Sequence, residues 1–201
     1  LSSSSAASDV YKRQVLDTTP PLITANISSG QVFGLNQIQF DIAISDQSNV
    51  SSQKFINGVG GGGASTKNFS FIANLSEGLN EVRIDSVDGL GNSASLTIDN
   101  LVVDTTAPVI IANITDGQEI GRLVFDLIIN ITESRLKDTK LSINGTQVLQ
   151  TTDQGFSYSP NYIEGLNSVR VESEDLLGNI SVVEYNNLLV DRTPPVVVSS
   201  L

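Results

Sequence analysis

Three features of the sequence predict an all-β protein made of tandem β-sandwiches with about seven strands each. Apolar and polar residues alternate over short segments such as 37–45, which is the pattern of a strand with one buried face. Turn-forming residues separate these segments at regular intervals, and no segment has the period of an amphipathic helix. The third feature is an internal repeat, which indicates where each sandwich begins.

The repeat is marked by a short motif that occurs three times, 87 residues apart, at Asp17–Pro21, Asp104–Pro108 and Asp191–Pro195. Proline fixes φ and pushes the preceding residue toward extended backbone, so each copy of the motif is typical of a stiff connector. We therefore expect one domain at 17–103, a second at 104–190, and the start of a truncated third repeat at 191–201.

Residues 1–14 precede the first repeat and need a separate interpretation. The hexapeptide Asp9–Gln14 can be encoded by GAT GTG TAT AAG AGA CAG, which looks like the transposon-end adaptor of sequencing libraries. We expect a disordered tail that is an adaptor artefact, with a natural disordered linker as the alternative.

The expected strands of the first repeat are defined by apolar residues on alternating positions. A third expected strand ends at Ile56 and has no such pattern of its own. In order along the chain, the residues that define the other strands are Ile23, Ala25 and Ile27; Ile38, Phe40, Ile42 and Ile44; Phe69, Phe71 and Ala73; Val82, Ile84 and Ser86; and Leu96, Ile98, Leu101 and Val103. A two-residue hairpin is expected at Asn57-Gly58 and at Asn144-Gly145, because both residue types tolerate positive φ.

Two local features refine this pattern. Gly60–Gly63 occupy the positions of Gln147–Gln150, and glycine loses much entropy on ordering, so we expect a mobile loop in the first domain and a strand in the second. The last strand changes parity near Asp99-Asn100 and again near Asn186-Asn187, which predicts a β-bulge in both copies.

Composition narrows the classes of function. The net charge of −11 argues against nucleic acid as a partner, and no apolar run is long enough to predict membrane insertion. The chain has no Cys and no His, which removes thiolate chemistry, disulfides and the usual general base. Carboxylates that recur in both copies suit structure better than one active site, so we expect no enzyme activity.

With the repeats aligned, the sequence resembles the bacterial immunoglobulin-like (Big-type) repeats of large surface adhesins and secreted proteins. The motifs that carry the resemblance are Val103–Pro108, Asn144-Gly145, Glu164–Asn167 and Asp175–Asn179. The resemblance implies extracellular, seven-stranded immunoglobulin-like β-sandwiches that form a stalk or spacer. Their partners would be neighbouring repeats of the same chain, with a distal host or surface ligand left unidentified.

Three positions are acidic in both copies: Asp17 and Asp104, Asp46 and Glu133, Asp88 and Asp175. In a seven-stranded sandwich the loops that hold them meet at one end, where the preceding domain would add Glu77. Oxygen ligands in flexible loops suit Ca²⁺, so Asp104, Glu133, Asp175 and Glu77 are a candidate inter-domain calcium site, and the resemblance supports it. The alternative is that these residues only cap their own turns.

Two functions are compatible with the sequence. The first is a structural stalk that projects a distal binding region from a bacterial surface. The second is an accessory module of a secreted hydrolase that contacts polysaccharide, which would be expected to show aromatic side chains on an exposed face. Phe40, Phe69 and Phe156 fall at inward positions, which favours the stalk.

Overall fold

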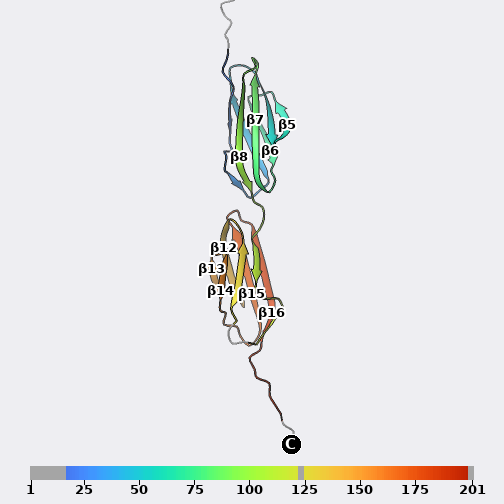
Figure 1. The fold of residues 1–201 in the computed structure, drawn as a ribbon, viewed down its shortest axis with the longest axis vertical. Coiled ribbons are helices and arrows are strands. Elements are labelled where there is room, and N and C mark those ends of the chain that lie inside the picture. Colours follow the sequence, from blue (N-terminus) through green and yellow to red (C-terminus); the bar gives the residue numbers. More distant parts are fainter. Residues whose placement is uncertain (1–16, 122–124, 199–201) are drawn as a thin grey trace, which may run out of the picture. The chain divides into compact units, whose positions relative to one another are not determined.

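The computed structural model describes residues 17–121 and 125–198, and every regular element within these ranges is a β-strand. The chain forms two compact units, with the boundary between Asp104 and Thr105 (Figure 1). The expected tail at residues 1–14 lies outside the described residues, as does the end of the expected third repeat. Over the described part, no helix is long and apolar enough to cross a membrane.

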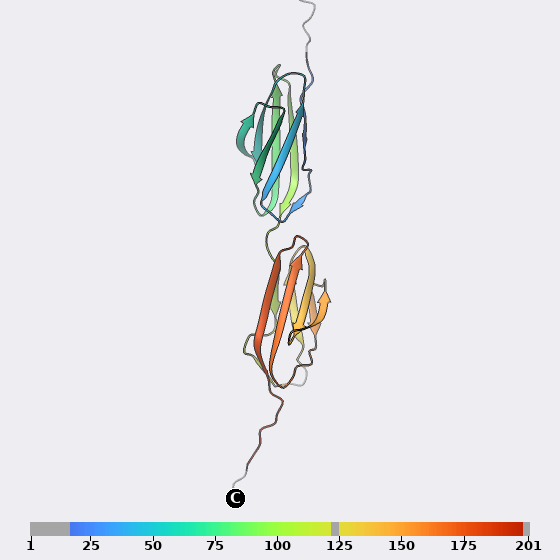
Figure 2. The same cartoon turned by 180° about the vertical axis from the view of Figure 1, so that it is seen from behind.

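The first unit is a sandwich of two sheets, seen from both sides in Figures 1 and 2. The three-stranded sheet has the order β1 (Leu22–Ala25), β3 (Gln37–Ser45), β6 (Asn68–Asn74). The five-stranded sheet has the order β2 (Val32–Phe33), β8 (Ser93–Val103), β7 (Gly78–Asp88), β4 (Val50–Ile56), β5 (Val59–Ala64).

The second unit repeats this topology strand for strand. Its three-stranded sheet has the order β9 (Val109–Ala112), β11 (Leu127–Thr132), β14 (Gly155–Tyr158). Its five-stranded sheet has the order β10 (Glu119–Ile120), β16 (Ile180–Val190), β15 (Gly165–Asp175), β12 (Leu136–Ile143), β13 (Thr146–Thr151). The prediction of tandem immunoglobulin-like β-sandwiches is confirmed.

The sequence alternation sorts residues between core and solvent. Strand β3 alternates strictly between exposed and buried positions, and its Ile38, Phe40, Ile42 and Ile44 face inward. Val82 and Ile84 of β7 meet them from the five-stranded sheet. Burying such side chains stabilises the fold by about 1.5–3 kcal/mol each, so each unit has an aliphatic core of its own.

The expected hairpins and bulges are confirmed. Asn57 and Gly58 have φ of 49° and 79°, and the equivalent residues Asn144 and Gly145 have φ of 48° and 78°. Asp99 and Asn100 together oppose one residue of β7, because the register shifts between Asn80 and Val82. The same shift occurs in β15 between Asn167 and Val169.

The prediction of a loop at Gly60–Gly63 is wrong. These residues form most of β5, which pairs antiparallel with β4. A Cβ at Gly63 would lie 2.7 Å from the carbonyl oxygen of Ser52, so the two backbones approach too closely for any side chain there. Pairing with β4 therefore overrides the weak strand propensity of glycine. The strand expected at Gln147–Gln150 is confirmed as part of β13.

The N-terminal strand of each unit is divided between the two sheets. In the first unit β1 pairs antiparallel with β3, and the chain then crosses so that β2 pairs parallel with the last strand, β8. The N–H of Val102 donates to Gln31 O and the N–H of Asp104 donates to Phe33 O, both at 3.0 Å. The second unit pairs β10 parallel with β16 in the same way.

Candidate functional site

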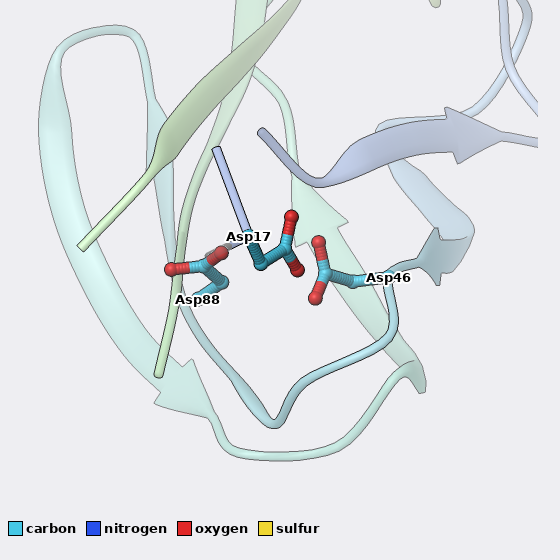
Figure 3. A group of neighbouring side chains, drawn as sticks. All are labelled: Asp17, Asp46 and Asp88. Carbon is cyan, nitrogen blue, oxygen red and sulfur yellow. The ribbon is translucent and has the colours of Figure 1, made fainter. Parts of the chain in front are cut away.

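Three carboxylates meet at one end of the first unit (Figure 3). Asp17 precedes β1, Asp46 follows β3, and Asp88 is the last residue of β7. Each contributes an oxygen, and the three oxygens lie within 4.8 Å of one another. The topology brings them together because the start of the first strand and these two loops share one end of the sandwich.

Asp88 is held by its own loop and is almost fully buried. One carboxylate oxygen accepts the N–H groups of Leu90 and Asn92, both at 2.8 Å, and the other accepts the side-chain amide of Asn92 at 2.7 Å. Burial raises the pKa of Asp88, but these hydrogen bonds outweigh it and leave the pKa below its usual value. Asp88 therefore stays charged at neutral pH.

Asp46 and Asp17 each use one carboxylate oxygen to cap the turn that follows them. Asp46 accepts the N–H and hydroxyl of Ser48 at 2.7 and 2.8 Å, and Asp17 accepts the N–H and hydroxyl of Thr19. These are the Asx turns that the alternative interpretation expects. The second oxygen of Asp17, Oδ2, is inaccessible to solvent and has no hydrogen-bond partner among the described residues.

A cation is the chemical species that this arrangement accommodates best. Ca²⁺ binds oxygen at about 2.3–2.6 Å, so oxygens that share one ion lie up to about 5 Å apart, as they do here. Three carboxylates this close repel one another, and a buried carboxylate oxygen without a partner is unfavourable. Turn capping accounts for the first oxygen of Asp17 but not for the second.

The second repeat holds the corresponding group, Asp104, Glu133 and Asp175, with oxygens within the same 4.8 Å. Asp175 is fully buried and accepts the N–H groups of Leu177 and Asn179 at 2.8 Å. Burial raises its pKa, and the hydrogen bonds from its loop again outweigh that effect, so the pKa is lowered. Three of the four predicted site residues are thus near neighbours. Glu77 lies just before β7 of the first unit, and its participation stays a prediction.

One difference between the two groups was not recognised from the sequence. The ammonium of Lys67 donates to the main-chain oxygen of Asp46, and the amide of Gln154 donates to that of Glu133. Lys67 and Gln154 are 87 residues apart and so occupy equivalent positions. The first group therefore has a cation of its own beside it, whereas the second has a neutral amide.

The acids are not arranged for hydrolysis of a glycosidic bond. A general acid needs a raised pKa, and the buried acids Asp88 and Asp175 have lowered values because their loops donate to them. Their carboxylate oxygens also accept hydrogen bonds from the backbone N–H groups of their own turns. The geometry supports binding of a cation or capping of turns.

Comparison with known proteins agrees with the fold. The sequence matches no protein-family profile and no curated protein sequence. A titin I-band fragment, I67–I69, is similar with a TM-score of 0.62 and 10% identity over 87% of this chain and 66% of the titin fragment. Two weaker similarities are to a 1.5-MDa bacterial ice-binding adhesin (TM-score 0.44, 16% identity, 88% and 67% covered) and to fibronectin(III)-like modules of Clostridium thermocellum CbhA (0.42, 11%, 85% and 95%). At these identities the titin similarity supports the immunoglobulin-like fold alone.

Proposed function

We propose that the two units are Big-type spacer repeats of an extracellular bacterial adhesin-like protein, and that they project a distal binding region from the cell surface. The observation that carries the proposal is the parallel pairing of the last strand of each unit with the second part of its divided N-terminal strand, β8 with β2 and β16 with β10. The chain starts the first unit beside Asp46 and Asp88 and leaves it at Val103, next to Gly78 at the opposite end of β7.

This pairing determines how a unit responds to tension between its ends. Pulling moves β2 and β8 past each other along their own axes, so their hydrogen bonds are sheared together. If the terminal strands were antiparallel, the chain would enter and leave the unit at the same end, and the bonds would open one after another. A module that transmits force between a surface and a distal ligand benefits from the sheared arrangement.

The alternative, a module that contacts polysaccharide, has less support. Phe40 is fully buried, and Phe69, Phe71 and Phe156 pack against the cores. Phe55 faces outward, but the guanidinium of Arg83 lies 4.2 Å from its ring centroid and covers one face. The carbohydrate platform expected of such a module is therefore not available at Phe55.

The test is to stretch the chain from its ends in a single-molecule force experiment. Val102→Pro removes the N–H that donates to Gln31 O, whereas Val102→Ala keeps it. We expect two unfolding events, each releasing at most about 300 Å of chain. The proline variant should lower the force of one event and leave the other unchanged. Equal forces in the proline and alanine variants would contradict the proposal.

We also propose that the carboxylate groups bind a divalent cation, with Ca²⁺ the ion best suited to their oxygens. The supporting observation is the buried, unpartnered Oδ2 of Asp17 beside two other carboxylates. Bound Ca²⁺ would stabilise the folded unit by about 2.7 kcal/mol at a hundredfold excess over Kd.

Asp17→Asn tests the cation proposal, because its effect on the melting temperature should have opposite signs with and without Ca²⁺. In chelator the variant should melt higher than the parent, because one of three repelling charges is gone. In millimolar Ca²⁺ it should melt lower, because a ligand is lost. The control is Glu81→Gln, which removes an exposed carboxylate elsewhere. If the melting temperature of the parent is the same in Ca²⁺ and chelator, the acids serve only as turn caps.

A further inference from the structure

Strand β5 leaves a free sheet edge in the first unit. It is the outermost strand of its sheet, so one row of its backbone groups has no neighbouring strand within residues 17–121 and 125–198. Its first five residues are exposed, and Gly60–Gly63 present no side chains. Such an edge is a template for pairing with another chain, and natural proteins block such edges with charges, bulges or prolines.

The neighbouring strand β4 carries a charge at a position that faces the core. Lys54 pairs with Ile84 of β7, which is fully buried, and it shares its face with the buried Ser52. The equivalent residue in the second unit is Leu141, one of the largest fully buried side chains. An inward-facing lysine at this position needs a route to solvent, because a buried ammonium without a partner is strongly unfavourable.

The glycines of β5 provide that route. A Cβ at Gly61 would lie 2.9 Å from Cε and 3.0 Å from Cγ of Lys54, so the lysine stem occupies the space that a side chain would take. Its ammonium ends 4.3 Å from the ring centroid of Phe71, on β6 of the other sheet. Figures 1 and 2 both show β5 and β6 on the same side of the first unit. Lys54 thus passes beneath β5 to the opening between the two sheet edges.

Lys54 has no carboxylate partner there within the part of the chain that the structure describes. None of the ion pairs among the described residues includes it, although the chain carries a net charge of −11. Phe71 instead supplies the face of its ring, and it stacks on the buried Phe40 with centroids 5.3 Å apart. A cation over an aromatic face is stabilised modestly while it keeps much of its water.

We propose that Lys54 keeps the free edge of β5 from pairing with the β5 edge of a second copy of this chain. A strand added to β5 would cover the opening and desolvate the ammonium. In a symmetric pair of copies, two such ammonium groups would face each other across the seam. The register shift between β4 and β5 at Gln53/Phe55 adds a bulge to the same edge. This inference is independent of cation binding and of the spacer role.

The test uses the full chain and compares Lys54→Met with Lys54→Arg. Methionine is unbranched and fits the same path over Gly61, but it carries no charge, whereas arginine keeps the charge. Sedimentation over a concentration series should show a dimer dissociation constant at least about tenfold lower for Lys54→Met than for the parent. Amide hydrogen exchange in β5 should slow with concentration in this variant alone. Lys54→Arg should remain monomeric like the parent.

A double variant identifies the surface that associates. Adding Gly62→Lys to Lys54→Met places a charged side chain on the edge strand, at a position where a Cβ has open space. This variant should return to a monomer. Lys54→Met that stays monomeric overturns the proposal, and so does a double variant that remains dimeric, because association would then not involve β5.

Discussion

The two units share strand order, hairpins and bulges but close the same side of the sandwich differently. In the second unit, Leu141 fills the core under β13, and Val148 and Leu149 pack against it. In the first unit, the equivalent positions hold Lys54 and two of the four glycines of β5. Turn residues and the alternation of apolar and polar residues therefore determine the fold, while the side chains that pack under the edge strand β5 or β13 can differ. Each difference between the units can be tested by exchanging residues.

The largest effect should come from moving the lysine to the second unit. Leu141→Lys places an ammonium at a fully buried position under β13, where Val148 and Leu149 pack against the core, so we expect a loss above about 4 kcal/mol, enough to unfold that unit. Denaturation followed by amide exchange in each unit measures the loss. The reciprocal Lys54→Leu should leave the first unit folded. If Leu141→Lys is tolerated equally well, the glycines of β5 are not needed as a route.

The second unit alone should lose stability in strong alkali through Tyr162, which replaces Leu75 of the first unit. Burial raises the pKa of Tyr162 to about 12, and its hydroxyl has no partner among the described residues. Because the folded pKa exceeds the unfolded value of 10.0, the stabilisation is complete below pH 10 and falls by about 2–3 kcal/mol as pH rises to 12. Tyr162→Phe should remove most of this loss and leave the contribution of Tyr185, whose pKa burial also raises. It should also stabilise the unit by about 1 kcal/mol at neutral pH. If the stability of the variant's second unit falls as steeply between pH 10 and 12 as that of the parent, the loss comes from other groups.

A buried hydroxyl pair occurs in both cores and should respond in both units. Thr139 and Ser173 hydroxyls lie 2.6 Å apart, and Ser52 and Ser86 lie 3.1 Å apart. Ser173→Ala should cost about 1–3 kcal/mol, because it leaves the Thr139 hydroxyl buried without its partner. Thr139→Val combined with Ser173→Ala should recover most of that loss in urea denaturation. A double variant as unstable as the single one would show that packing, not hydrogen bonding, is responsible.

The smallest effect should come from exchanging Lys67 and Gln154. Lys67→Gln removes the cation beside Asp46 and should destabilise the first unit by less than about 1 kcal/mol. Gln154→Lys should stabilise the second unit by a similar amount and weaken its response to Ca²⁺. Both changes should shrink in high salt. Shifts that are independent of salt would point to lost packing rather than charge.

Much of the fold was predictable because it depends on local chemistry. Alternation in β3 placed Phe40 and Ile42 in the core, and Asn57-Gly58 specified its hairpin through positive φ. The strand at Gly60–Gly63 was not predictable from propensity, since it depends on pairing with β4 and on the path of Lys54. Repeat alignment pointed to the acidic positions, but the contact of Lys67 with Asp46 joins loops that are distant in sequence.

The most direct test of the spacer account changes only the direction of force on the first unit. The chain has no Cys, so handles can be attached at introduced cysteines alone. Pulling through Thr18→Cys and Ala107→Cys shears β2 against β8, whereas pulling through Leu79→Cys and Ala107→Cys opens β7 from β8 at the Gly78–Val103 pair. The account predicts a severalfold higher unfolding force for the first geometry. Equal forces in the two geometries would contradict it.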